Sequence, residues 1–142
     1  MITEDTYKKA LAQVADAERA IKESSPDDDV DAISALFRKI THDCATVFPN
    51  LKIFQLGGPL HDDLVKITKA YAFYRSEFSY IPGAHAVAAT FLVNLDPFST
   101  FIAMANSLNR PLPLAFLSGN QMIVFSFVTG LILETQVLYT IR

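Results

Sequence analysis

The side chains that could carry out chemistry are few, and they are not spaced for a familiar catalytic or metal site. The three histidines, His42, His61 and His85, show neither an H-E-x-x-H pattern nor a close ligand spacing, so no metal site is predicted. The sequence also has no G-x-S-x-G nucleophile motif and no phosphate-binding loop. Asp62 and Asp63 are more simply the acidic first turn of a helix than a pair of catalytic carboxylates. No cofactor is expected.

Cys44 is the single cysteine, so it cannot form a disulfide within the chain, which suits a reducing compartment. It falls at an apolar helical position after Phe37 and Ile40, and we expect a small buried side chain rather than a reactive thiol. The first residues have no basic flank and no apolar core, so a secretory signal is not expected. We therefore expect a cytosolic protein.

Composition limits the chain to one modest domain. It has 142 residues, of which 51% are hydrophobic, enough for a core of its own. Twelve basic residues against 15 acidic ones give a net charge of −3 without a basic cluster. Binding to nucleic acid is not expected, because it requires clustered Lys and Arg to neutralise phosphates.

Most of the chain has the periodicity of amphipathic helices, with apolar residues three or four positions apart. The predicted helices span residues 6–23, 30–45, 60–75, 84–94 and 97–108. The fourth is apolar almost all round, which predicts a central position. Asp96 and Pro97 give the last helix an N-cap and a first-turn proline in the favoured order. Since no alternation typical of strands appears before residue 120, the predicted fold class is all-α.

The chain divides into three parts by sequence character. Residues 1–29 form a helix and an acidic linker, residues 30–119 the main helical domain, and residues 120–142 an atypical apolar tail. The apolar run from Met122 to Leu133 ends at Glu134 and is shorter than the ~20 residues that a membrane span needs. Insertion into a membrane is therefore not expected. A buried strand and a buried helix remain alternatives for the run.

Four segments of the main domain carry a resemblance to a known family. They are Ile40-x-x-Asp43-x-x-Thr46, Gly57-Gly-Pro-Leu-His61, Ala70-Tyr-x-x-Tyr-Arg75 and Tyr80-Ile-Pro82-Gly83. In this order and spacing they resemble the TBC family, helical domains that accelerate GTP hydrolysis by Rab GTPases. The likeness extends from about Tyr7 to about Gly119, so the chain resembles the N-terminal part of a TBC domain with a different ending.

The resemblance implies that two catalytic groups are replaced. The family signatures are I-x-x-D-x-x-R and Y-x-Q-G, and they place an arginine and a glutamine against the bound GTPase. Thr46 stands at the arginine position and is uncharged and too short, and Pro82 stands at the glutamine position and has no N–H or amide. Asp43, which the resemblance implies would orient the arginine, is retained.

Nearby residues could in principle substitute for the missing groups. Arg38 and Lys39 lie one to two helical turns before Thr46, and we expect both to face elsewhere. His85 could offer an imidazole, but we expect a partly exposed histidine in the first turn of its helix. We therefore predict that the chain is not a catalyst of GTP hydrolysis.

By resemblance, the partner is a Rab-type small GTPase and the role is in vesicle traffic, with a cytoplasmic location that extends to the surface of endomembranes. The residues implied to contact the GTPase are Ile40, Asp43, Thr46, Arg75, Tyr80, Pro82 and Gly83. Three hypotheses remain open: a module that binds Rab proteins without catalysis, a truncated and non-functional fragment of a former activator, and an activator with residual activity. Half a helical domain also leaves apolar faces without partners, which predicts self-association.

Overall fold

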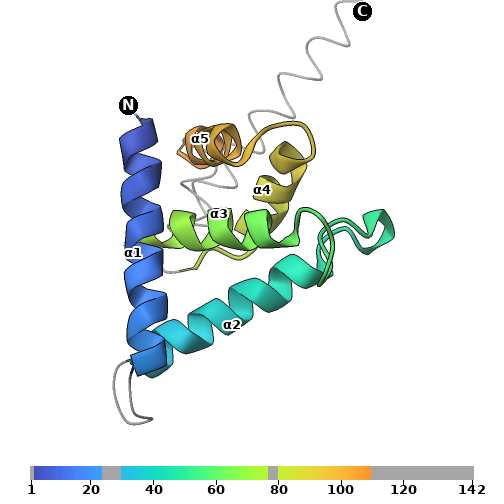
Figure 1. Cartoon of the computed structure of the whole chain (residues 1–142). Helices are drawn as coiled ribbons and strands as arrows, with labels where there is room; N and C mark the ends of the chain where they lie inside the picture. The colour runs from blue at the N-terminus through green and yellow to red at the C-terminus, as the bar shows by residue number, and fades with distance from the viewer. Residues whose placement is uncertain (1, 24–29, 77–79, 110–142) are drawn as a thin grey trace, which may run out of the picture. The chain divides into compact units, whose positions relative to one another are not determined.

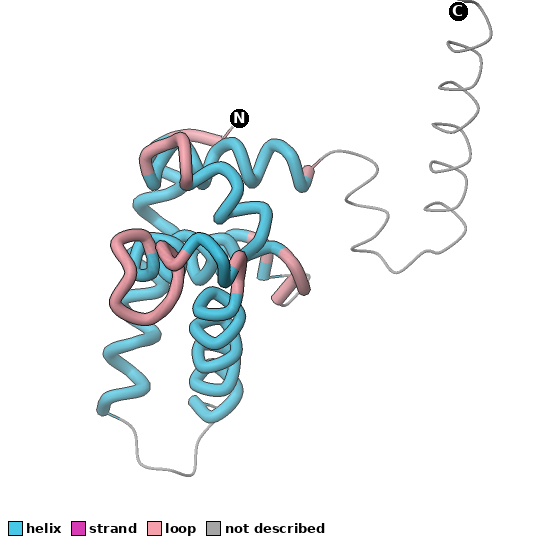
Figure 2. Tube along the Cα trace, turned by 90° about the vertical axis from the view of Figure 1, so that its right-hand side faces the viewer, coloured by secondary structure: helices cyan, strands magenta, loops and turns pink. Residues whose placement is uncertain are grey.

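The computed structural model describes residues 2–23, 30–76 and 80–109, and over these residues it consists of helices and loops (Figure 2). The elements are α1 (Glu4–Glu23), α2 (Val30–Thr46), the 3-10 helix η1 (Pro49–Leu51), α3 (His61–Tyr74), α4 (Ala84–Leu92) and α5 (Pro97–Leu108). No strand occurs in this described part, so the predicted all-α class is confirmed. The helix bounds agree closely with those predicted from periodicity.

The chain separates into two compact units, Met1–Asn106 and Ser107–Arg142. The helices described below belong to the first unit. The apolar run at residues 122–133 lies outside the described residues, so the choice between strand and helix stays open. No described helix is long and apolar enough to cross a membrane.

Helix α3 forms the centre of the first unit and contacts α1, α2 and α4 (Figure 1). Its side chains Leu64, Ile67 and Ala70 are fully buried at 0% exposure, as is Ile40 of α2. Burial of each large apolar side chain contributes about 1.5–3 kcal/mol relative to its exposed state. The apolar stripes that predicted these helices are thus the contacts that hold them together.

A group of aromatic rings joins α1, α3 and α5. The ring of Phe101 lies 4.8 Å from that of Tyr7, 5.7 Å from that of Tyr74 and 6.5 Å from that of Tyr71, measured between centroids. Both contacts to α3 are edge-on, an arrangement that the ring quadrupoles favour. Helix α5 begins as predicted, because the Asp96 carboxylate accepts hydrogen bonds from the backbone N–H groups of Phe98 and Ser99, each at 3.1 Å.

Helix α4 is buried on one face rather than enclosed, so the prediction of a central helix is wrong. Ala84, Ala88 and Leu92 are buried, whereas Thr90 and Val93 are exposed. The small alanines let α4 approach its neighbours closely on that face. The high apolar content of this short helix came from alanine as much as from large side chains, and alanine does not require burial.

The loop between α2 and α3 is held in a specific conformation. Phe48 and Lys52, on either side of η1, both have left-handed backbone angles (φ 43° and 57°), which are uncommon for residues other than glycine. Such strain persists only when the surroundings fix it. Hydrogen bonds do so here: Leu51 N–H donates to Phe48 O at 2.9 Å and Leu60 N–H to Ile53 O at 3.0 Å.

The Gly57-Gly-Pro-Leu-His61 segment closes this loop. Gly57 has φ 80°, and a Cβ on Gly58 would lie 2.5 Å from the Ile53 carbonyl oxygen, so glycine is required at both positions. His61 is buried, and its Nδ1 lies 2.8 Å from the Phe54 carbonyl oxygen. The segment is therefore structural, as its sequence indicated.

Candidate functional site

The surface of α2 divides into three faces, of which one carries the signature residues. Phe37, Ile40 and Cys44 are buried against α3. Lys39, Asp43 and Thr46 follow one another at four- and three-residue spacings and so share one flank of the helix. A separate flank, with Arg38 and Thr41 on it, faces a groove beside α1.

Thr46, which the resemblance aligns with the arginine position, is the last residue of α2, and its hydroxyl bonds to the helix backbone. Its Oγ1 donates to the backbone carbonyl of Asp43 at 3.0 Å, and the side chain is exposed. The hydroxyl thus satisfies a carbonyl in the last turn, where helix carbonyls lack partners within the helix. It carries no charge and does not extend from the surface.

Pro82, at the glutamine position, lies in a tight turn that suits proline. Ala84 N–H donates to Ile81 O at 3.1 Å, and Gly83 has φ 86° and ψ −8°. These values are those of the third residue of a type II turn, which favours glycine there and proline just before it. Proline therefore fits this position of the turn, and its side chain offers no amide.

Tyr80 and His85 flank this turn and bring it to Asp43 of α2. The Tyr80 hydroxyl lies 2.9 Å from His85 Nδ1. The Asp43 carboxylate also interacts with this phenol, and as a carboxylate it can only accept a proton from it. The two signature segments, far apart in the sequence, thus meet at one place on the surface.

The environment of this cluster keeps Tyr80 and His85 neutral. Burial, followed by the hydrogen bond and the negative charge of Asp43, raises the pKa of Tyr80 well above its ordinary value. Burial also lowers the pKa of His85, and the nearby Asp43 charge opposes that effect only in part. At neutral pH the imidazole therefore does not supply the positive charge that an arginine would.

Lys39 belongs to the same cluster, contrary to the prediction that it faces elsewhere. Its ammonium lies 5.6 Å from the centre of the Tyr80 ring, within the range of a cation–π interaction. The spacing from Lys39 to Asp43 is one helical turn, and this could have indicated that they share a flank. Arg38 does face elsewhere, as predicted, because it lines the groove beside α1.

His85 was expected to be a partly exposed first-turn histidine. It is indeed half-buried in the first turn of α4, but its bond to Tyr80 makes it part of the cluster. This contact could not be predicted from helical periodicity, because a turn brings the two residues together. A recess of about 350 Å³ between α2 and α3 lies beside Tyr80, with Leu36 and Phe73 among its lining residues.

The remaining residues predicted to contact a GTPase occupy different positions. Ile40 is fully buried, so its side chain packs in the core rather than lying on the surface. Arg75 is half-buried at the end of α3, where its backbone N–H donates to the backbone carbonyl of Tyr71 at 2.9 Å. Pro82 and Gly83 are exposed.

Metal ligands and a reactive thiol are not part of this site. In the part of the chain that the structure describes, no group of three or more His, Cys, Asp and Glu side chains could hold a metal ion. Cys44 is fully buried, with its Sγ 3.7 Å from Thr68 Oγ1, which confirms the prediction of a small buried side chain. Burial raises the pKa of its thiol to about 11, so it stays protonated at neutral pH.

The surface that results has three features. It combines an exposed turn at Pro82 and Gly83, an exposed helix end at Thr46, and polar groups that already bond to one another. Stabilising a phosphoryl transition state requires a permanent charge aimed at the phosphate oxygens and a group that holds the attacking water. Neither Thr46 nor Pro82 supplies such a group.

Comparison with known proteins identifies the type of domain. A family model described as the Rab-GTPase-TBC domain matches residues 2–136. This range is longer at both ends than the stretch from about Tyr7 to about Gly119 over which the motifs resemble the family.

Several relatives are similar to the chain over much of its length. TBC1 domain family member 12 of Rattus norvegicus is 40% identical over 120 residues, which cover 81% of this chain and 17% of that protein. Drainin of Dictyostelium discoideum is 38% identical over 95 residues, covering 67% of this chain and 22% of that protein. TBC1 domain family member 14 of Homo sapiens is 47% identical over 74 residues, covering 52% of this chain and 11% of that protein. The chain thus spans less than a quarter of the length of these relatives.

Proposed function

Since the chain belongs to the Rab-GTPase-TBC domain family, we propose that it binds a Rab-type GTPase without accelerating GTP hydrolysis. The binding surface is the flank of α2 that carries Asp43 and Thr46, together with the turn from Tyr80 to Ala84. The observation that supports the proposal is that Thr46 and Pro82, which the motifs align with the two catalytic positions, carry no charge and no amide and lie in an ordered helix end and an ordered turn.

The absence of catalysis follows from what the two positions must supply. An arginine finger contributes about 10³–10⁵-fold in rate, because a planar, permanent charge meets the electrons that gather on the phosphoryl oxygens. Thr46 has no charge, and its hydroxyl bonds to Asp43 O. A glutamine holds water by donating and accepting at once, and Pro82 does neither.

The retained scaffold supports binding. Gly83 keeps the positive φ of its turn, and the Tyr80–Asp43 contact holds that turn against α2. A surface fixed in this way loses little conformational entropy when a partner binds. Thr46 and Pro82 are both exposed and both small, so neither blocks the approach of a partner.

Two alternatives make different predictions. A residual activator would use Lys39, the cation nearest to Tyr80 in the cluster, although an ammonium is a single point charge and this one already lies against an aromatic ring. A non-functional fragment would bind no Rab protein, because the chain covers only 17–22% of relatives such as member 12 and drainin.

The role that follows from Rab binding is regulation by sequestration or scaffolding in vesicle traffic. The chain would then act in the cytoplasm and peripherally at endomembranes, where Rab proteins of the trafficking pathways are found. Family membership supports this placement, and it depends on the binding proposal.

The experiment is a paired measurement on a panel of purified Rab proteins. GTP hydrolysis is followed with and without the full chain, and binding is followed by pull-down with each Rab protein loaded with GTP or GDP. We expect binding to at least one GTP-loaded Rab protein and no acceleration of hydrolysis. Acceleration would establish the residual activator, and a complete lack of binding by a folded chain would overturn the proposal.

Matched variants locate the binding surface. Pro82→Glu and Thr46→Glu change exposed residues of the proposed surface. The control is Val93→Glu, at the residue directly after α4, which is 49% exposed. We expect the first two to weaken Rab binding by about tenfold, which corresponds to about 1.4 kcal/mol, and the control to leave it unchanged.

A further inference from the structure

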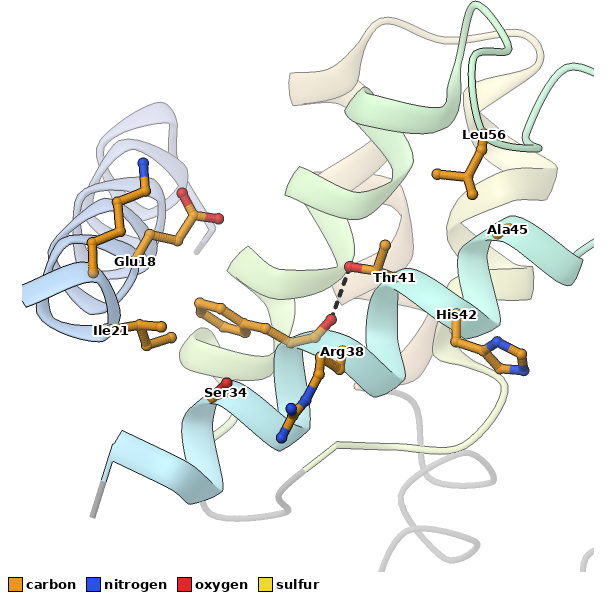
Figure 3. Close-up of a pocket in the computed structure, with 10 residues that line it drawn as sticks. Glu18, Ile21, Ser34, Arg38, Thr41, His42, Ala45 and Leu56 are labelled. Atoms are coloured by element: carbon orange, nitrogen blue, oxygen red, sulfur yellow. Dashed lines mark hydrogen bonds between the residues drawn. The ribbon is translucent and has the colours of Figure 1, made fainter. Parts of the chain in front are cut away.

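A groove runs along the flank of α2 that faces away from the Asp43–Tyr80 cluster (Figure 3). It encloses about 670 Å³, and its walls are the end of α1, the length of α2 and the tip of the loop before α3. Its lining residues include Ile21 on α1, Thr41 and Ala45 on α2, and Leu56 on the loop. The family signatures do not fall on this flank.

The α2 side of the groove carries mostly small side chains. Ser34, Thr41 and Ala45 line it, with Arg38 between the first two, at spacings of four, three and four residues, which is the stripe that a helix presents to another helix. Thr41 Oγ1 donates to Phe37 O at 2.8 Å, so its polar atom is satisfied within α2. The small side chains along the stripe allow the backbone of a partner helix to approach closely.

The rim of the groove carries positive charge. The side chains of Lys22 and Arg38 line it, and in the described part of the chain neither forms an ion pair or a hydrogen bond. The imidazole of His42 lies beside them. The one acidic lining residue, Glu18, is already neutralised, because its carboxylate lies 2.7 Å from the Lys69 ammonium. Figure 3 shows Arg38 and His42 extending from α2 along the same edge. A ligand with negative charge would therefore complement this rim.

The far end of the groove is closed by a large apolar side chain held away from the core. Leu56 is 77% exposed, more than the other exposed large apolar side chains of the described residues. Hydrogen bonds hold its loop in one conformation, in which Phe48 and Lys52 keep left-handed backbone angles. Leu56 is therefore exposed from an ordered loop. Leu56 is preorganised to contact a partner.

We propose that this groove binds an acidic amphipathic helix of another protein. The apolar face of that helix would lie along the α2 stripe between Ile21 and Leu56, and its acidic residues would pair with Lys22 and Arg38. This is the helix-in-groove mode, in which apolar anchors at helical spacing fill the groove and flanking charges set the orientation. The groove is a second site, independent of the proposed Rab-binding surface.

The test is a selection from a library of displayed peptides of about 16 residues, or about four helical turns. Leucines are fixed at helical spacing, and the flanking positions vary among Glu, Lys, Gln and Ala. The full chain is the bait, and we expect enrichment of Glu at the flanking positions. Enrichment of Lys, or no enrichment, would overturn the proposal.

Variants then identify the surface, with affinities measured by fluorescence polarisation of an enriched peptide. We expect Leu56→Asp to weaken binding by about tenfold and Lys22→Glu by about fivefold, because the first removes an apolar anchor and the second reverses a rim charge. The matched controls are Val93→Asp, at another exposed apolar position, and Lys9→Glu, at another exposed lysine of α1. Equal losses in variant and control would overturn the site.

Two further readouts separate this site from other interpretations. Thr46→Glu and Pro82→Glu should leave peptide binding unchanged, whether or not they affect Rab binding. Sedimentation of the wild type and of Leu56→Asp tests a second copy of this chain as the occupant. A dimer that Leu56→Asp dissociates would assign the groove to self-association and overturn the proposal.

Discussion

The polar groups on the two flanks of α2 differ in whether they have partners within the described residues. On the signature flank, Tyr80 interacts with both Asp43 and His85, the Lys39 ammonium lies over the Tyr80 ring, and Thr46 bonds to the helix backbone. On the groove flank, the positive side chains of Lys22 and Arg38 have no partner within the described residues. Helix α2 therefore carries a polar network on one side, and on the other side it forms a charged rim together with the end of α1.

The difference indicates where recognition by charge remains available. A network whose members satisfy one another is stiff, and it holds a surface in shape without offering free charge. The unpaired charges of a rim gain favourable interaction energy only when a partner of opposite charge binds. The signature flank is thus suited to shape recognition of a folded GTPase, and the groove flank to recognition of an acidic helix.

The largest effect is expected where both flanks depend on the same residue. Ile40 is fully buried, and Ile40→Ala should lower the free energy of unfolding by about 2–5 kcal/mol through the lost contacts and the cavity. Thermal and chemical denaturation measure this change. If the substitution cost less than 1 kcal/mol, α2 would not be anchored through this face and the comparison of its flanks would lose its basis.

A smaller effect should separate the flanks. A Cβ at Gly58 would meet the Ile53 carbonyl oxygen at 2.5 Å, so Gly58→Ala should cost about 1–3 kcal/mol and disturb the loop that carries Leu56. We expect peptide binding in the groove to fall while Rab binding persists. Gly83→Ala is the counterpart, because it strains the φ of 86° in the other turn and should affect Rab binding alone.

The sequence predicted the helices well for physical reasons. Their apolar stripes at three- and four-residue spacing are the buried faces, and Asp96 with Pro97 marks the start of α5 through local hydrogen bonds. The sequence also indicated the turn at Gly57-Gly-Pro-Leu-His61, because close packing of the backbone requires glycine. These features depend on residues near one another in the chain.

The site itself was only partly predictable. Thr46 and Pro82 could be placed by resemblance, but the contact of Lys39 and His85 with Tyr80 depends on how a turn meets a helix about 40 positions earlier in the chain. The left-handed backbone at Phe48 and Lys52 gave no signal, since neither residue type favours it. The exposure of Leu56 follows from the conformation of that loop, so it could not be predicted from the sequence either.

The closed network should have a measurable but modest energy. Tyr80→Phe removes the hydroxyl that joins Asp43 and His85, and we expect it to cost about 1 kcal/mol of stability, the net value of a typical hydrogen bond. The matched control is Tyr74→Phe on α3, away from the cluster. If both variants lost the same stability, the hydroxyl of Tyr80 would have no special role.

The network also gives stability a dependence on pH. Burial lowers the pKa of His85 in the folded state below its ordinary 6.5, so the unfolded chain binds the proton more readily. The stability contributed by neutral His85 is therefore present above pH 6.5 and is lost as the pH falls through its folded-state pKa. We expect His85→Gln to flatten the decline in stability on acidification. If the free energy of unfolding depended on pH equally in the variant and the wild type, His85 would not be desolvated in the folded state.

The smallest effect is expected at the position that matters most for chemistry. Pro82 is exposed at the second position of a type II turn that proline favours but does not require, so Pro82→Gln should change stability by less than about 1 kcal/mol. The double variant Thr46→Arg, Pro82→Gln should then fold and restore both catalytic groups at positions already held by the Tyr80–Asp43 contact. If it binds a Rab protein and still fails to accelerate hydrolysis, the loss of activity would lie in the body of the domain rather than in the two replaced side chains.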